Sequence, residues 1–125
     1  MKTIWYVDDD GEMIRAVKLM LQLLGYDTVS FSDARAAAKK LLKGDRPDVL
    51  LLDINMPDVT GIDFLEFVRR RSGWNDLPII MFSSEAADIQ VDTAMDLGAD
   101  AYVFKPVTLE ELEEALEIAK AKRKV

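Results

Sequence analysis

The chain has 125 residues and contains no cysteine and no histidine. It can therefore form no disulfide, thiol nucleophile, histidine base or phosphohistidine, and no zinc or haem site of the usual kind. A domain of this length buries enough apolar surface to fold without a disulfide or a structural metal. The sequence predicts a single folded domain over residues 1–125, in a reducing, cytoplasmic setting.

Long apolar runs and an excess of positive charge are also missing. No run approaches the ~18 residues that span a membrane, and the acidic residues 8–10 come too early for a signal peptide. The net charge is −7, with 23 acidic and 16 basic residues. We therefore expect contact with neither a membrane nor nucleic acid, and we expect the basic clusters 69–71 and 120–124 to be solvated.

Five short apolar segments alternate with segments of helical periodicity. The predicted strands are residues 3–7, 27–31, 48–52, 79–82 and 101–104. Between and after them, apolar residues recur three and four positions apart, as they do in amphipathic helices. Two of these helices begin with a capping-box pair, Thr60 with Asp63 and Thr108 with Glu111. Four helices are each predicted to end at a glycine: Gly25, Gly44, Gly73 and Gly98.

This alternation indicates the fold class. Nearly unbroken apolar strands such as residues 49–52 are typical of a parallel sheet that is covered on both faces. The sequence therefore predicts an α/β domain with a single doubly wound five-stranded parallel sheet, strand order 2-1-3-4-5, and five helices. In such folds ligands bind at the carboxyl ends of the strands.

Polar side chains stand at that end of four predicted strands: Asp8 and Asp9, Asp53, Ser83 and Lys105. Each aspartate taken alone fits a turn or a helix cap. Three carboxylates in one crevice repel one another, however, and direct coordination to a divalent cation offsets that cost. The sequence thus predicts a Mg²⁺ site formed by the three aspartates.

A magnesium site beside a lysine and a hydroxyl is typical of phosphoryl transfer. The chain has neither of the glycine-rich nucleotide loops, GxxxxGK[ST] or GxGxxG, which argues against nucleotide binding. Without histidine or cysteine, a carboxylate is the natural covalent acceptor. Asp53 is the predicted nucleophile, because the strand order places it between the acid pair and Ser83.

Four motifs, in order, resemble the receiver domain of bacterial response regulators, which has a flavodoxin-like fold. They are VDDD at 7–10, LLLDINMPDVTG at 50–61, IIMFSSE at 79–85 and AYVFKP at 101–106. The resemblance extends from end to end, so residues 1–125 are identified as one receiver domain. The sequence does not tell whether this domain stands alone or belongs to a longer chain.

The resemblance implies a role for each site residue. Asp8 and Asp9 would bind Mg²⁺ together with Asp53 and the backbone carbonyl of Asn55. Asp53 would accept the phosphoryl group. Ser83 and Lys105 would contact the phosphoryl oxygens, and the peptide bond between Lys105 and Pro106 would be cis.

The resemblance also implies a switch and its partners. A sensor histidine kinase or a phosphotransfer protein would supply the phosphoryl group. Ser83 and Tyr102 would then move and change the face formed by the fourth helix, the fifth strand and the fifth helix, where an output domain or target protein binds. Asn55 and Glu85 would tune self-dephosphorylation, so the domain would catalyse its own phosphorylation and dephosphorylation without being an enzyme for other substrates.

Two alternatives remain at this point. A haloacid-dehalogenase-like phosphatase also combines an aspartate nucleophile, magnesium, a hydroxyl and a lysine, but residues 53–55, Asp-Ile-Asn, lack its second aspartate. The missing acid would be the general acid/base, and the chain is too short for a substrate cap. The other alternative is a receiver-like interaction module that works without phosphate.

Overall fold

A computed structural model of the chain describes residues 2–84 and 88–123, with only the backbone of residues 88 and 89. Within these residues, one parallel sheet has the strand order β2-β1-β3-β4-β5, which confirms the predicted fold class and order. The strands are β1 (Thr3–Val7), β2 (Asp27–Phe31), β3 (Val49–Asp53), β4 (Ile79–Ser83) and β5 (Ala101–Phe104). The helices are α1 (Gly11–Leu23), α2 (Ala34–Leu42), α3 (Gly61–Arg69), α4 (Asp88–Asp96) and α5 (Leu109–Lys122).

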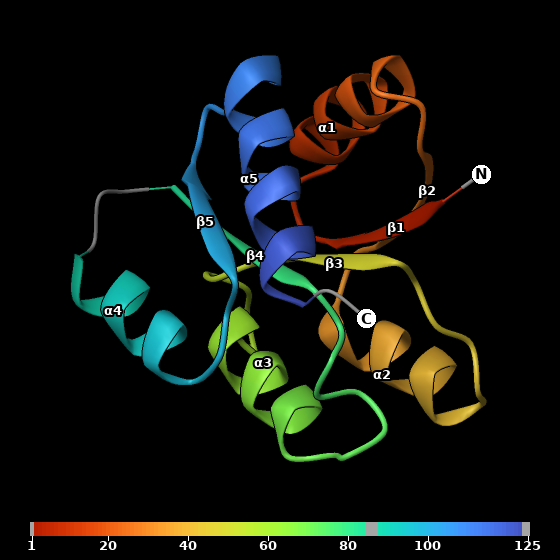
Figure 1. Cartoon of the computed structure of the whole chain (residues 1–125), viewed down its shortest axis with the longest axis vertical. Helices are drawn as coiled ribbons and strands as arrows, with labels where there is room; N and C mark the ends of the chain where they lie inside the picture. Colours follow the sequence, from red (N-terminus) through yellow and green to blue (C-terminus); the bar gives the residue numbers. More distant parts are fainter. Residues whose placement is uncertain (1, 85–87, 124–125) are drawn as a thin grey trace.

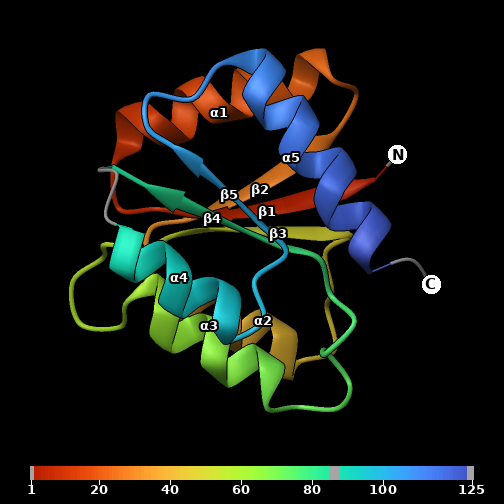
Figure 2. The ribbon, with the colours of Figure 1, turned by 60° about the vertical axis from the view of Figure 1, so that its left-hand side comes forward.

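The sheet separates two layers of helices (Figures 1 and 2). Helices α1 and α5 cover one face, and α2, α3 and α4 cover the other. Alternate strand residues feed the two cores: Ile4 and Tyr6 point to the α1/α5 side, and Trp5 and Val7 to the other. Every residue of β3 and β4 is buried, which explains why these strands carry almost unbroken apolar sequence.

The helix boundaries follow the sequence signals at most ends. Both predicted capping boxes, at Thr60 and Thr108, are present. The stop predicted at Gly73 is wrong, because α3 already ends at Arg69 and Gly73 lies in the turn that follows. Among the described residues, no helix is long and apolar enough to cross a membrane.

A buried ion cluster lies at the amino ends of the strands, opposite the predicted site. Asp100 is only 2% exposed. Its carboxylate accepts hydrogen bonds from Arg69 Nη2 at 3.0 Å, from Arg123 Nε at 2.6 Å and from the backbone N–H of Ile79 at 2.9 Å. These bonds connect the end of α3 and the end of α5 to the start of β5.

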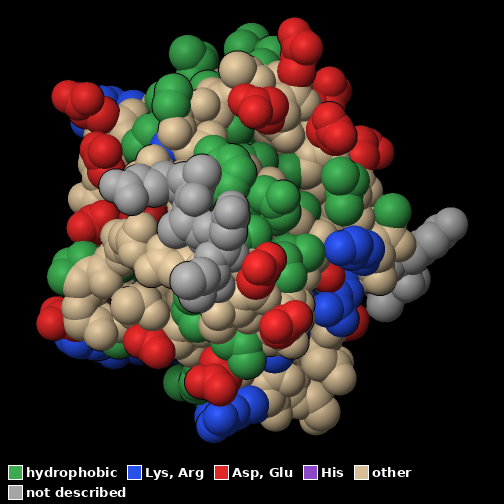
Figure 3. Space-filling model, turned by 90° about the vertical axis from the view of Figure 1, so that its left-hand side faces the viewer, with side chains coloured by type: hydrophobic (Ala, Val, Ile, Leu, Met, Phe, Trp, Pro, Cys, Tyr) green, Lys and Arg blue, Asp and Glu red, His purple; other side chains and the backbone are tan. Residues whose placement is uncertain are grey.

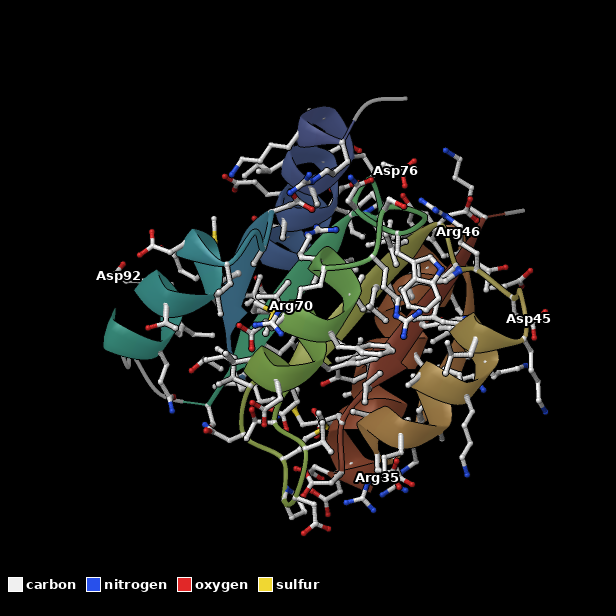
Figure 4. All side chains as sticks on the ribbon, turned by 90° about the horizontal axis from the view of Figure 1, so that it is seen from below. Arg35, Asp45, Arg46, Arg70, Asp76 and Asp92 are labelled. Atoms are coloured by element: carbon white, nitrogen blue, oxygen red, sulfur yellow. The ribbon has the colours of Figure 1, made fainter. Side chains whose placement is uncertain are left out.

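The expectation that both basic clusters are solvated is therefore wrong for Arg69 and Arg123. A buried carboxylate is costly unless cations pair with it, and these two arginines provide the pairing. The expectation of a solvated side chain is correct for Arg70, which is 75% exposed and pairs with Glu66 on the outer side of α3 (Figure 4).

A second ion pair also lies at the amino ends of the strands. Arg46, just before β3, contacts Asp76, just before β4, at 2.7 Å, and the two side chains lie side by side in Figure 4. The hydrogen bond from Arg46 lowers the pKa of Asp76. Both partners are partly exposed, so this pair contributes little to stability.

Candidate metal and phosphoryl site

The carboxyl ends of four neighbouring strands deliver the predicted site residues to one place. Asp8 follows β1 directly, Asp53 is the last residue of β3, Ser83 is the last residue of β4, and Lys105 follows β5. Asp8, Asp53 and Ser83 are buried. The strands are all parallel, but the direction in which successive strands are added to the sheet reverses between β1 and β3, where doubly wound sheets leave a crevice. Glu85 lies outside the described residues.

The three predicted ligands form a compact acidic group. One carboxylate oxygen from each of Asp8, Asp9 and Asp53 lies within 4.8 Å of the other two. Asp9 is exposed, which leaves one side of the group open to solvent. The next acid, Asp10, is not part of this group but caps α1, since its carboxylate accepts a hydrogen bond from the backbone N–H of Glu12 at 3.0 Å.

Lys105 joins two of the carboxylates. Its Nζ lies 2.8 Å from Asp8 Oδ2 and 3.3 Å from Asp53 Oδ1, and the side chain is 13% exposed. Burial alone would lower the pKa of Lys105, but hydrogen bonds and attraction to the two carboxylates raise it. With all groups ionised, three carboxylates and one ammonium leave an excess of two negative charges, which one divalent cation would balance.

The two buried carboxyls differ in acidity. Burial and the nearby Asp8 charge raise the pKa of Asp53 to about 6, although Lys105 opposes them. Burial alone would raise the pKa of Asp8 as well, but hydrogen bonds from Lys105, Tyr6 and the Asp10 backbone lower it. Asp8 therefore stays ionised at neutral pH, whereas Asp53 is ionised at a cost. The oxygen donors, their closeness and their excess charge all fit Mg²⁺.

Tyr6 belongs to the site and was missed by the sequence reasoning. Its hydroxyl donates a hydrogen bond to Asp8 Oδ2, and its side chain is fully buried. Burial and the Asp8 charge raise the pKa of Tyr6, so the phenol stays protonated and remains a donor. The signal was present in the sequence, because residues two apart on a strand lie on the same face.

The loop after β3 is held close to Asp53. The backbone N–H of Asn55 lies 3.3 Å from Asp53 Oδ1, and the N–H of Gly61, at the start of α3, donates to the Ile54 carbonyl at 3.1 Å. Asn55 is exposed, whereas Met56 is buried under the loop. The side chain of the predicted nucleophile and the backbone of the next residue are therefore both hydrogen-bonded within the segment from Asp53 to Gly61.

Ser83 and Tyr102 occupy contrasting positions. Ser83 is fully buried, and its carbonyl accepts a hydrogen bond from the Lys105 N–H at 2.7 Å. The Lys105–Pro106 peptide bond is cis, as the family resemblance implied. Tyr102 is 44% exposed and packs edge-on against Phe104, with ring centroids 5.4 Å apart. It is therefore a surface aromatic on β5, not part of the core.

The face around β5 carries apolar side chains beside acidic ones (Figure 3). A groove of about 430 Å³ lies between β5 and α5, with Met95 of α4 at its margin. Tyr102 and Ile118 line it, and both are more than 40% exposed. Glu111 and Glu114 of α5 supply negative charge along the same groove.

Comparisons with known proteins agree with this geometry. The response regulator receiver domain family matches residues 4–117, and the chain belongs to that family. Its members are signalling domains of two-component systems. The chain is 37% identical to the chemotaxis protein CheY1 of Helicobacter pylori over 113 residues, which cover 90% of this chain and 91% of that protein.

Other relatives differ in how much of their length is shared. The transcriptional regulatory protein KdpE of Mycobacterium tuberculosis is 34% identical over 89% of this chain, but the match covers only 47% of KdpE. The solved structure of Vibrio cholerae CheY4 is 32% identical, has a TM-score of 0.84 and covers 95% of this chain and 98% of that one. A putative response regulator from Chloroflexus aurantiacus has a TM-score of 0.90 at 26% identity, covering 96% of this chain and 98% of that one.

Proposed function

We propose that this domain is a phosphorylation-activated switch that accepts a phosphoryl group on Asp53 from a phosphohistidine. The donor would be a sensor histidine kinase or a phosphotransfer protein. One observation carries the proposal: Asp53 is a buried carboxylate whose neighbours, Asp8, Asp9 and Lys105, supply a cation site and a fixed positive charge within a few ångströms.

The chemistry follows from where these groups lie. Mg²⁺ held by Asp8, Asp9, Asp53 and the Asn55 carbonyl would neutralise charge on the phosphoryl oxygens. An Asp53 oxygen would attack phosphorus in line, the P–N bond would break with its electrons passing to the imidazole, and an acyl phosphate would remain on Asp53. Lys105, already 3.3 Å from Asp53, would then contact a phosphoryl oxygen.

The output step would use Ser83 and Tyr102. A phosphoryl group on Asp53 would attract the Ser83 hydroxyl and favour an inward position of Tyr102. That shift between two states would alter the face of α4, β5 and α5, where an output domain or target protein would bind. The apolar groove beside Tyr102 supports this choice of face.

Phosphorylation with a small donor tests the proposal. Acetyl phosphate and Mg²⁺ should place an acid-stable, base-labile label on Asp53, and Asp53→Asn should abolish it. Asp10→Asn is a matched control, because Asn caps a helix as well as Asp does and Asp10 serves as a cap. Lys105→Ala should keep Mg²⁺ binding but impair transfer or the response.

Three outcomes would contradict this assignment. A label on Ser83 or Ser84 in mass spectra would show that the nucleophile is wrong. Absence of any label would favour a module that works without phosphate. Turnover of small phosphate esters would favour a phosphatase.

The switch itself is tested by NMR. Backbone amide signals should move more on the α4, β5 and α5 face than on α2 when a phosphoryl mimic binds at Asp53. Ser83→Ala should uncouple that face from the site. Changes confined to the loops around the site would indicate a phosphate carrier without this output.

A further inference from the structure

We propose that Tyr6 is a positioning residue for the cation site, and that its hydroxyl holds the Asp8 carboxylate in place when Lys105 turns to a phosphoryl group. The inference rests on the proposed function. It concerns a residue that neither contacts the phosphoryl group nor binds the cation, and that acts through Asp8.

Tyr6 has a fixed position in the core. It lies on β1 between buried neighbours, and its ring packs against Phe82 of β4, with centroids 5.0 Å apart and the planes tilted by 44°. Phe82 directly precedes Ser83, so the ring packs against the strand that delivers Ser83, while Tyr6 itself lies on the strand that delivers Asp8. The hydroxyl consequently reaches Asp8 from a direction that packing determines.

The partners of Asp8 show what the hydroxyl adds. Asp8 Oδ1 accepts the Asp10 N–H at 2.9 Å, and Oδ2 accepts both the Tyr6 hydroxyl and Lys105 Nζ. Lys105 is shared with Asp53, so any movement of the lysine toward a phosphoryl oxygen removes a donor from Asp8. The Tyr6 hydroxyl would remain and keep the fully buried carboxylate hydrogen-bonded and oriented.

The alternative is that Tyr6 only fills space. Phenylalanine would then serve equally well, because the ring makes the packing contact with Phe82. A tyrosine hydroxyl in the core needs a polar partner, and here that partner is a predicted cation ligand. The two roles of Tyr6, filling and positioning, separate when only the hydroxyl is removed.

The test is Tyr6→Phe, with Mg²⁺ affinity measured by titration calorimetry using the metal alone. We expect the dissociation constant to rise about tenfold or more, as is usual when the hydrogen-bond partner of a metal ligand is lost. Tyr26→Phe is the matched control. Its hydroxyl accepts a hydrogen bond from Lys120 at 2.6 Å, away from the site, and its removal should leave Mg²⁺ affinity unchanged.

The outcomes separate the two proposals. If the parent binds Mg²⁺ and Tyr6→Phe binds it equally well or more tightly, the role of Tyr6 is overturned while the proposed function stands. If the parent binds no Mg²⁺, both are overturned. Phosphorylation by acetyl phosphate at saturating Mg²⁺ adds a second readout, in which Tyr6→Phe should be slower than Tyr26→Phe.

If the Tyr6→Phe variant does not fold, a measurement on the parent protein tests the proposal instead. With ¹³C-labelled tyrosine, the ring Cζ signal of Tyr6 should shift on saturation with Mg²⁺, because the carboxylate that it contacts acquires a new partner. The signal of Tyr26 should stay in place. A Tyr6 signal that does not move would overturn the proposal.

Discussion

Gly61 lies directly against the backbone carbonyl of Asp53. A Cβ atom at Gly61 would stand 2.1 Å from the Asp53 oxygen and 2.8 Å from its carbonyl carbon. Only a residue without a side chain allows α3 to begin so close to the end of β3. The position of the predicted phospho-acceptor therefore depends on the absence of a side chain at Gly61, eight positions further along the chain.

Replacing Gly61 with alanine should lower the free energy of unfolding by about 2–3 kcal/mol, because backbone must shift to admit the methyl group. Phosphorylation should slow as well. Gly73→Ala is the control, since a Cβ there meets nothing within 4 Å, and its effect should stay within about 0.5 kcal/mol. Urea denaturation measures both, and equal stabilities would contradict the close approach.

Magnesium should stabilise the fold by relieving repulsion among Asp8, Asp9 and Asp53. At a concentration ~100 times its dissociation constant, the expected gain is about 2.7 kcal/mol. In EDTA, Asp53→Ala should be more stable than the parent, because one of three neighbouring carboxylates is gone. Thermal melts from zero to tens of millimolar Mg²⁺ check both statements, and an unchanged melting temperature of the parent would contradict the site.

The same carboxylate predicts a pH dependence. The pKa of Asp53 is raised to about 6 in the folded, metal-free protein, from 3.8 when exposed. Its contribution to stability is therefore complete below pH 4 and is lost as the pH rises to 6. Asp53→Asn lacks this loss, so in EDTA it should gain on the parent by on the order of 2–3 kcal/mol between pH 4 and 7. Denaturation of both proteins at a series of pH values measures this. A difference in unfolding free energy between parent and variant that stays constant from pH 4 to 7 would contradict the raised pKa.

Two neighbouring arginines, the last residue of α3 and the residue after it, should behave very differently. Arg69→Ala breaks a buried bond to Asp100 and should cost about 2–3 kcal/mol, somewhat less than a fully orphaned charge because Arg123 remains. Arg70→Ala removes an exposed pair with Glu66 and should cost less than about 0.5 kcal/mol. Chemical denaturation compares them, and Asp53 phosphorylation should be unaffected in both. Similar costs would mean that the Asp100 cluster contributes no more than a surface pair.

The lifetime of the phosphorylated state should depend on Asn55 and Glu85, which follow Asp53 and Ser83 at the same spacing of two residues. An amide and a carboxylate are suited to hydrogen-bond an attacking water molecule. Replacing both with bulky residues should slow hydrolysis about tenfold or more, or ~1.4 kcal/mol in the barrier. The hydrolysis rate is measured as the loss of phosphoryl label over time in Mg²⁺, without a phosphatase. A double variant that loses its label at the parental rate would contradict the prediction.

Local signals explain why so much of the fold was predictable. Strand–helix alternation, capping pairs such as Thr108 with Glu111, and polar residues at strand ends are each visible within a few residues of sequence. The parallel sheet then brings Asp8, Asp53 and Lys105 together with no further information. For this reason the sequence alone predicts that the site lies at the carboxyl ends of the strands.

Contacts between distant residues were not predictable in this way. Arg69 and Arg123 look like ordinary surface cations, and only the fold shows that both reach the buried Asp100. The spacing of two residues places Tyr6 on the same face as Asp8, but it does not show that the Tyr6 hydroxyl reaches the Asp8 carboxylate. Its bond to Asp8 depends on how the ring is turned by Phe82, a contact between strands far apart in sequence.

The Asp100 cluster gives α5 a fixed end. The helix starts at the Thr108 capping box, and Arg123, directly after its last turn, is hydrogen-bonded to Asp100 just before β5, so the carboxyl end of the helix is anchored to the sheet. If this face responds to phosphorylation as proposed above, side chains such as Tyr102 would move more readily than the whole helix would slide. In engineering terms, a protein fused directly after Arg123 would be joined to a helix end that a side-chain hydrogen bond attaches to the sheet.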